Sequence, residues 1–423
     1  MKFNKTTLKN GLRIITVPIT DHPSVTVLIM AETGSKYESK ETNGLSHFLE
    51  HMLFKGTPKR PNATDISREL DGVGAQYNAF TSNEYTGYYA KVAPHQLNFA
   101  LDILSDIYLN PLFKKEEIEK EKGVVVEEIR MYKDLPQRIV GNVFMELMYG
   151  NQPVGWTITG SEENVKSFTR EQLFAYKNSQ YVAESTIVIV AGSFDEAKII
   201  DQVTRSFGTL SLEKKKPKLL VTESQSAPAI KTYFKETDQT HLIIGLRTFG
   251  ILDPRTPTIN VLATILGKGM SSRLFSKMRD QLGICYYVSA DQDAYIDHGV
   301  FEISAGVDNS RVDEAIKGIM EECERLKNEP VSVDELKKAK DNISGRTLLE
   351  LETSDARGEF CAYQEILKGK IETPEDIIAR IQIVTAEQIQ TLAQEIFVNK
   401  NLNLAVVGKF KDDTQFKGYF GFK

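Results

Sequence analysis

The sequence predicts an α+β fold made of two homologous tandem domains, each with a mainly antiparallel sheet packed with helices. The first observation is a repeat: a helix, a short connection and an apolar strand closed by Gly-x-Phe end each half, with Gly192 and Gly408 lying 216 residues apart. The second is that each half begins with strand-like alternation and continues with long helical patterns. One repeat of this length indicates tandem domains rather than a solenoid.

Strands are expected first in each half. They are residues 12–19 (LRIITVPI) and 24–32 (SVTVLIMAE) in the first half, and 230–236 (IKTYFKE) and 240–248 (THLIIGLRT) in the second. Helices are expected at 45–53, where Gly56 and Pro58 follow and stop the helix, and at 115–134. The second half contains a counterpart of the latter helix, since DELKKAK from Asp334 resembles EEIEKEK from Glu116.

A segment rich in Lys, Ser and Pro separates the halves, SLEKKKPKLLVTESQSAPAI at 211–230. Such a composition is typical of a linker. We place the domain boundary near Ser224, which gives a first domain of residues 1–223 and a second of residues 224–423.

The composition excludes several classes of protein. The net charge is −6 with opposite charges interspersed, and the longest basic run lies in the linker, which does not indicate nucleic-acid binding. No apolar run approaches a membrane span. The N-terminus lacks the features of a signal peptide, and three widely spaced cysteines do not form a disulfide framework. We therefore expect a soluble, cytoplasmic protein that binds neither nucleic acid nor membrane.

Two of the six histidines lie in the stretch HFLEH, which places His47, Glu50 and His51 at positions i, i+3 and i+4. On a helix these positions share one face, so both imidazoles can reach one ion. A hydrolytic zinc site uses three protein ligands and leaves one position open for water, whose proton a nearby glutamate accepts. The motif supplies two ligands and the base, but it lacks the third ligand. A helix that simply contains two histidines remains the alternative.

Candidates for the third ligand lie on the expected helix 115–134. Glu121 and Glu128 are seven residues apart and share a face, while Glu127 is rotated by about 100° from that face. The neighbouring run GVVV indicates that this turn is partly buried, and a buried carboxylate requires a partner such as a metal ion. The alternative for each acid is a solvated helix surface.

The motifs HFLEHMLFKGT and GVVVEEIRMYKD, taken with their spacing, resemble the inverted-motif zinc peptidases of the pitrilysin type, which include insulin-degrading enzyme and the mitochondrial processing peptidase. In that family the third ligand is a Glu 77 residues after the second His, and Glu128 occupies this place. A further family glutamate seven residues before the ligand supports the site, and Glu121 matches it. The resemblance therefore implies zinc held by His47, His51 and Glu128, with Glu50 as the base.

The resemblance covers nearly the whole chain. GVGAQYNAFTSNEYTGYYAKV looks like the family's hairpin, whose edge pairs with extended substrate, here along Asn78, Ala79, Phe80 and Thr81. An ordinary hairpin is the alternative. MRDQLGICYYVSA is similar to the family's Arg…Tyr segment, which implies that Arg279 and Tyr286 hold substrate or stabilise the oxyanion.

The second half is expected to be an inactive copy that carries this Arg–Tyr segment. LGKGMSSRLF, the counterpart of the zinc helix, contains no His or Glu, and Arg346 stands where the counterpart of Glu128 would be.

We therefore expect a zinc metalloendopeptidase that acts on peptides or unfolded polypeptide segments. Long family members have four homologous domains and this chain has two, so the resemblance implies a pair of chains around a chamber. A homodimer is the simplest pair and a heterodimer is possible, with Arg279 and Tyr286 acting on the partner chain's zinc. The alternative function is a non-catalytic or partner-dependent subunit of a processing-peptidase-like complex that binds or presents substrate.

Overall fold

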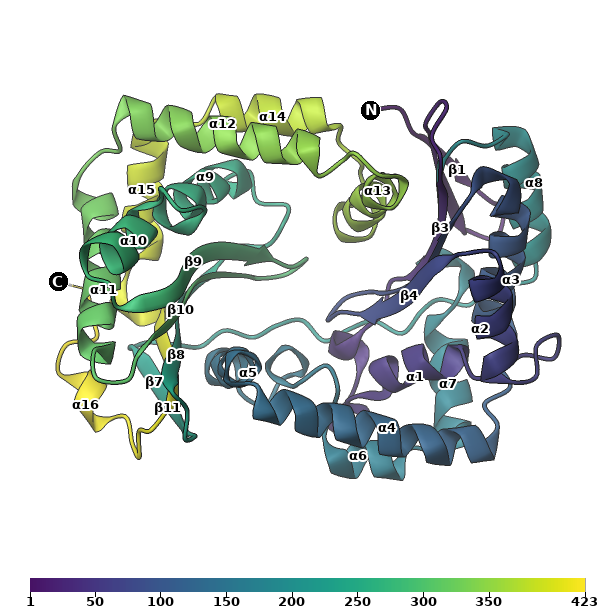
Figure 1. The fold of residues 1–423 in the computed structure, drawn as a ribbon, viewed down its shortest axis with the longest axis horizontal. Coiled ribbons are helices and arrows are strands. Elements are labelled where there is room, and N and C mark those ends of the chain that lie inside the picture. Colours follow the sequence, from purple (N-terminus) through teal and green to yellow (C-terminus); the bar gives the residue numbers. More distant parts are fainter. Residues whose placement is uncertain (423) are drawn as a thin grey trace. The chain divides into compact units, whose positions relative to one another are not determined.

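Two sheets with matching strand order organise the chain, in a computed structural model that describes residues 1–422 (Figure 1). The first sheet has the order β1-β2-β6-β3-β5-β4, and the second has the order β7-β11-β8-β10-β9. If β1 is left out and the strands of each sheet are numbered along the chain, both sheets have the spatial order first, fifth, second, fourth, third. The duplication predicted from the sequence is thus present in the topology, and the predicted α+β class with two homologous tandem domains is confirmed.

The elements of the first half are strands β1 (Asn4–Thr7), β2 (Arg13–Pro18), β3 (Val25–Ala31), β4 (Gln76–Thr81), β5 (Thr86–Val92) and β6 (Thr186–Gly192). Its helices are α1 (Leu45–Leu53), α2 (Ala63–Gly72), α3 (Leu97–Leu109), α4 (Lys115–Asp134), α5 (Pro136–Tyr149), α6 (Glu162–Ser167), α7 (Arg170–Gln180) and α8 (Glu196–Phe207).

The elements of the second half are strands β7 (Ala229–Phe234), β8 (Gln239–Thr248), β9 (Cys285–Ala294), β10 (Gly299–Asp308) and β11 (Leu402–Gly408). Its helices are α9 (Thr256–Gly267), α10 (Arg273–Phe275), α11 (Val312–Asn328), α12 (Val333–Leu349), α13 (Ser354–Lys368), α14 (Pro374–Gln382), α15 (Ala386–Ile396) and α16 (Thr414–Lys417). A π-helical turn, Ser276–Gln281, continues α10.

Most neighbouring strands are antiparallel. The exceptions are β2 beside β6 and β7 beside β11, which are parallel in corresponding places of the two sheets. In the first sheet β5 pairs with β3 from Val25↔Val92 to Ala31↔Thr86, and β4 pairs only with β5. One edge of β4 is therefore left without a partner strand among the described residues.

The chain folds into two units that are not continuous in sequence. Unit 1 contains residues 1–130, 156–219 and 350–371, and unit 2 contains residues 131–155, 220–349 and 372–423. The linker passes from unit 1 to unit 2 between Leu219 and Leu220. Helix α5 of the first half thus belongs to unit 2, and helix α13 of the second half belongs to unit 1. The division of the sequence repeat at residues 223 and 224 stays a prediction.

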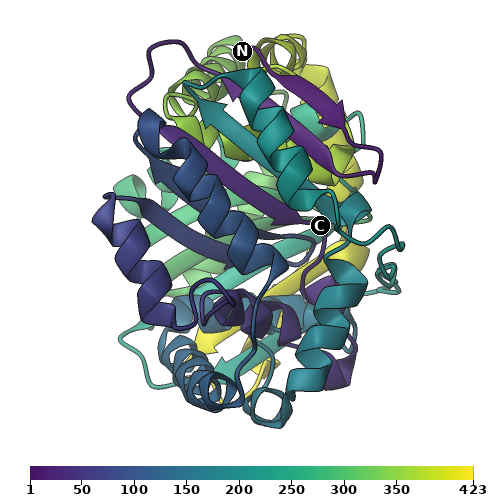
Figure 2. The same cartoon turned by 90° about the vertical axis from the view of Figure 1, so that its right-hand side faces the viewer.

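The sheet of unit 1 is covered on both faces. Helices α3 and α8 lie across one face, which Figure 2 presents to the viewer. Helix α13 covers the other face, where Cys361, Ala362 and Ile366 join a buried cluster with Leu28 and Ile189 of the strands. Ion pairs fasten this helix at its ends, from Lys5 and Arg13 to Glu365 and from Lys91 to Asp355.

The sheet of unit 2 is covered in the corresponding way by α5. Val140 and Phe144 of α5 pack on Ile243 and Val407 of the strands. A Cβ at Gly245 would lie 2.1 Å from the Phe144 ring, so the glycine allows this close approach.

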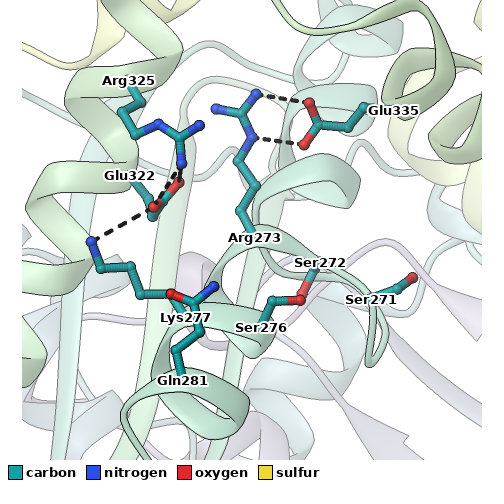
Figure 3. A pocket seen from close by; sticks show the side chains of 9 residues that line it. All are labelled: Ser271, Ser272, Arg273, Ser276, Lys277, Gln281, Glu322, Arg325 and Glu335. Atoms are coloured by element: carbon teal, nitrogen blue, oxygen red, sulfur yellow. Dashed lines mark hydrogen bonds and ion pairs between the residues drawn. The ribbon is translucent and has the colours of Figure 1, made fainter.

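Ion pairs also tie the helices on the other side of the unit 2 sheet. Arg273 is bound by both oxygens of Glu335, while Glu322 lies between Lys277 and Arg325 (Figure 3). These pairs join α10 and the π-helical turn to α11 and α12.

Within residues 1–422, no helix has both the length and the apolarity needed to cross a bilayer.

Candidate metal centre and active site

Helix α1 is held at its N-terminus by the buried carboxylate of Glu38. This carboxylate accepts hydrogen bonds from the backbone amides of Gly44, at 2.8 Å, and Ser46, at 2.6 Å. Burial raises the pKa of Glu38 to about 7, although these hydrogen bonds favour the charged form. Gly44 has φ +99°, and a Cβ there would lie 2.6 Å from the carbonyl oxygen of Thr159, so the position requires glycine. The chain directly before His47 is therefore fixed.

The structure brings the three predicted ligands together. His47 and His51 lie one turn apart on α1, and their Nε2 atoms are 3.6 Å and 3.5 Å from Oε2 of Glu128 on α4. The three ligand atoms lie within 4.8 Å of one another. Zinc bonds to nitrogen and oxygen are about 2.0–2.2 Å long, so tetrahedral ligand atoms around one ion lie about 3.4 Å apart. The spacing of these donors fits a single zinc ion.

Glu121 sets the orientation of the His51 ring. Its Oε1 lies 2.8 Å from His51 Nδ1, and its Oε2 pairs with Lys55 Nζ at 2.7 Å. A proton on Nδ1 leaves the lone pair of Nε2 directed toward Glu128, which is the form a metal ligand needs. Burial alone would raise the pKa of Glu121, but the hydrogen bonds from His51 and Lys55 outweigh it and hold this pKa below its usual value.

The pKa values of the two histidines are shifted in opposite directions. Burial, with a contribution from the charge of His51, lowers the pKa of His47 to about 4, so its ring is neutral at neutral pH. Burial also acts to lower the pKa of His51, but the hydrogen bond to Glu121 and the surrounding carboxylates outweigh it and raise this pKa. Because a metal binds the neutral imidazole, metal binding at His51 competes with protonation of this ring. Nδ1 of His47 is buried and has no hydrogen-bond partner within residues 1–422.

Glu127 is directed away from this cluster. Its side chain is 71% exposed and pairs with Arg130, whereas the side chain of Glu128 is 20% exposed. The helical rotation expected between these neighbours is thus observed.

Glu50 projects from α1 one turn after His47 and is linked to strand β4. Oγ1 of Thr81 donates a hydrogen bond of 2.6 Å to Oε2 of Glu50. Burial raises the pKa of Glu50, while the Thr81 bond and the charge of His51 act to lower it. A carboxylate with a raised pKa is suited to accept a proton and later return it.

Strand β4 carries the four predicted substrate-binding residues on an edge of the sheet. Asn78, Ala79, Phe80 and Thr81 pair on one side with β5. The backbone amide of Ala79 donates to the side-chain Oδ1 of Asn78 at 2.9 Å. An open strand edge can accept an extended peptide as a further strand.

Arg279 and Tyr286 lie together in unit 2. The Arg279 guanidinium donates a hydrogen bond to the backbone oxygen of Tyr286 and lies 5.8 Å from the centre of its ring. Tyr286 is 70% exposed. Among the described residues of unit 2, no three His, Cys, Asp or Glu side chains have ligand atoms within 4.8 Å of one another.

Sequence reasoning missed Glu38 and Lys55. Lys55 lies four residues after His51, a spacing that could have indicated a shared helix face. Glu38 lies in an irregular segment before α1, and no local pattern identifies it.

Models of known families match most of the chain. The model described as Insulinase (Peptidase family M16) matches residues 13–162, and the model described as Peptidase M16 inactive domain matches residues 167–343. The first match contains His47, Glu50, His51 and Glu128, and the second contains Arg279 and Tyr286.

Similar proteins occur in several bacteria. An uncharacterized zinc protease of Bacillus subtilis is 36% identical, over 92% of this chain and 95% of its own. Another, from Streptomyces coelicolor, is 33% identical, over 96% of this chain and 90% of its own. The fold is shared with a protease from Helicobacter pylori, with a TM-score of 0.91, 23% identity and coverage of 96% of this chain and 99% of that one. The resemblance stated from the sequence is confirmed: this chain belongs to peptidase family M16, the family of insulinase.

Proposed function

We propose that this chain is a zinc metalloendopeptidase that hydrolyses peptides or unfolded polypeptide segments inside a chamber formed by two chains. The observation that carries the proposal is the convergence of His47, His51 and Glu128, with Glu50 on the same helix. Membership of a peptidase family and the zinc proteases among its relatives support it.

His47, His51 and Glu128 would hold the zinc ion, which when bound polarises the scissile carbonyl and makes a water molecule more acidic. Glu50 accepts the proton that this water loses as its oxygen attacks the carbonyl carbon. The C–N bond then breaks, and the same carboxyl group delivers the proton to the leaving amine. Glu121 keeps the His51 ring in the required orientation.

The substrate lies as an added strand along Asn78–Thr81. Backbone hydrogen bonds to an edge strand recognise an extended main chain of any sequence, which suits peptides and unfolded segments. Because Thr81 bonds to Glu50, a peptide on this edge lies next to the base.

Arg279 and Tyr286 would stabilise the negative charge that develops on the carbonyl oxygen. We propose that they act on the metal site of a second chain, so that a homodimer is the active form. A cytoplasmic location stays a prediction.

The test is cleavage of a long, unstructured quenched-fluorescence peptide by the wild type and by Glu50→Gln, with zinc measured in both. Glu127→Gln is the matched control, because Glu127 is an exposed acid that pairs with Arg130 and is not a member of the proposed ligand group. We expect the wild type and Glu127→Gln to cleave, and Glu50→Gln to be inactive while it holds about one zinc per chain.

If the wild type holds zinc but does not cleave, the enzyme proposal fails and a partner-dependent subunit becomes the better account. If Glu50→Gln cleaves as fast as the wild type, Glu50 is not the base.

A further inference from the structure

Lys177 is a buried cation without an acidic partner. It lies on α7, is 7% exposed, and donates one hydrogen bond of 3.2 Å to the backbone oxygen of Leu109 at the end of α3. Within residues 1–422 no carboxylate forms an ion pair with it. An ammonium group has three N–H donors, and residues 1–422 provide one acceptor.

Burying a charge without a counter-ion is unfavourable, and proteins usually pair or expose such groups. Burial lowers the pKa of Lys177 to about 8, so the group still carries a proton in much of the population at neutral pH. The helix end at Leu109 offers a partial negative charge, which offsets only part of this cost.

A polar cavity in unit 2 shows how buried or half-buried cations are usually neutralised. Arg273, Lys277 and Arg325 surround it, and Glu322 and Glu335 neutralise them (Figure 3). The cations of that cavity are matched by acids that the chain itself supplies, whereas no acid within residues 1–422 pairs with Lys177.

Lys177 borders a cavity of about 490 Å³ formed by the ends of α3, α7 and α8 and the loop after α8. This volume lies in the range of small-molecule sites. Hydroxyl and amide groups line it, from Asn110, Asn178, Ser206, Thr209 and Ser211. The one acid in the lining is Glu213, an exposed residue of the loop after α8.

We propose that this cavity binds a small organic anion, whose phosphate or carboxylate group pairs with Lys177 Nζ and whose polar body bonds to the surrounding hydroxyl and amide groups. The anion supplies the negative charge and the acceptors that the chain leaves out. The site is separate from His47, His51 and Glu128, and the inference does not depend on the proposed peptidase activity.

The test is titration of the full-length, zinc-loaded protein at constant ionic strength. The probes are inorganic phosphate, glycerol 3-phosphate and glycerate, and the readouts are Kd by calorimetry and the midpoint of thermal unfolding. The variants are Lys177→Met and, as a matched control, Lys327→Met. Lys327 has a side chain 15% exposed but paired with Glu324, so its charge is already neutralised.

We expect at least one probe to bind the wild type and raise its unfolding midpoint. Lys177→Met should weaken Kd at least about tenfold, while Lys327→Met leaves it unchanged. Tighter binding of glycerol 3-phosphate than of glycerate identifies phosphate as the preferred group, and the reverse identifies carboxylate. If a probe binds the wild type and Lys177→Met with the same Kd, as an anion that coordinates the zinc would, the proposal is overturned.

Absence of binding for all three probes also overturns it. Should Lys177→Met fail to fold, Thr209→Val removes one lining hydroxyl from an exposed position and keeps the ammonium. A Kd for glycerol 3-phosphate or glycerate that is unchanged in Thr209→Val counts against the site, and a Kd weakened several-fold supports it.

Discussion

Oγ1 of Thr81 donates a hydrogen bond of 2.6 Å to Oε2 of Glu50, which connects the edge strand β4 to the metal-binding helix α1. This bond fixes the position of the proposed base, Glu50, relative to the proposed substrate-binding strand β4. A peptide that moved β4 would also change the hydrogen bonding of Glu50.

Replacing Thr81 with Val removes this bond and keeps the shape of the side chain. Since the hydroxyl stabilises the charged carboxylate, its loss raises the pKa of Glu50 further. We expect the acid limb of the pH profile of kcat/KM to move to higher pH. Activity should fall about tenfold on that limb, and the loss of activity should be smaller at alkaline pH. Thr81→Ser retains the donor and should keep the wild-type profile. An unshifted limb in Thr81→Val would show that the bond does not tune Glu50.

Glu121→Gln should weaken zinc binding by about 10- to 100-fold, because it removes the charge that orients and polarises His51. Zinc affinity is measured by competition with a chelating dye. Glu127→Gln on the same helix is the control and should bind zinc as the wild type does, since Glu127 is paired with Arg130 outside the site. Equal affinities for the two variants would remove Glu121 from the metal centre.

Mixing Glu50→Gln chains with Tyr286→Phe chains tests action across a dimer. If Tyr286 acts on the partner's metal site, half of the randomly mixed dimers have one working site, and the activity returns to about a quarter of the wild type. The control mixes Glu50→Gln with chains that carry both substitutions, and it should stay inactive. No recovery in the first mixture would show that Tyr286 acts within its own chain.

The burial of Lys177 predicts a pH-dependent difference between the wild type and Lys177→Met in buffers without anionic ligands. The pKa falls from 10.5 to about 8 on folding, so below pH 8 the group is charged in both states and the folded state bears the full penalty. As pH rises from 8 toward 10.5 the folded state loses its proton first, and the penalty disappears. The wild type should therefore gain up to about 3 kcal/mol relative to the variant over this range. The measurement is the midpoint of unfolding of both proteins at pH 7 and at pH 10. The same difference between the wild type and Lys177→Met at both pH values would contradict this prediction.

Local patterns in the sequence identified two candidate ligands and the candidate base of the metal centre, but not the third ligand. The spacing of His47 and His51 on a helix brings both rings to one side, and the rotation between Glu127 and Glu128 separates a surface acid from a cluster member. These relations depend only on helical geometry, which the sequence encodes directly. The choice of Glu128 itself came from the family spacing.

Other features depend on contacts between distant segments, and no local pattern reports them. Glu38 holds α1 through backbone amides, to which any sequence contributes equally. Lys177 has an ordinary position in a helical pattern, and only the fold shows that its hydrogen bond goes to a backbone oxygen and that no acid in the described part of the chain pairs with it. The sequence analysis made no prediction for α5 and α13, and no local pattern shows which sheet each of them covers.

The placement of α5 and α13 means that the linker is not the only connection between the two halves of the chain. Each half contributes a helix to the sheet formed mainly by the other, so noncovalent packing joins them as well as the peptide bond. A single proteolytic cut between residues 211 and 228 should give two bands under denaturing conditions and one particle in native gel filtration. The chain could thus be supplied as two polypeptides, encoded separately, that assemble only by exchanging these helices.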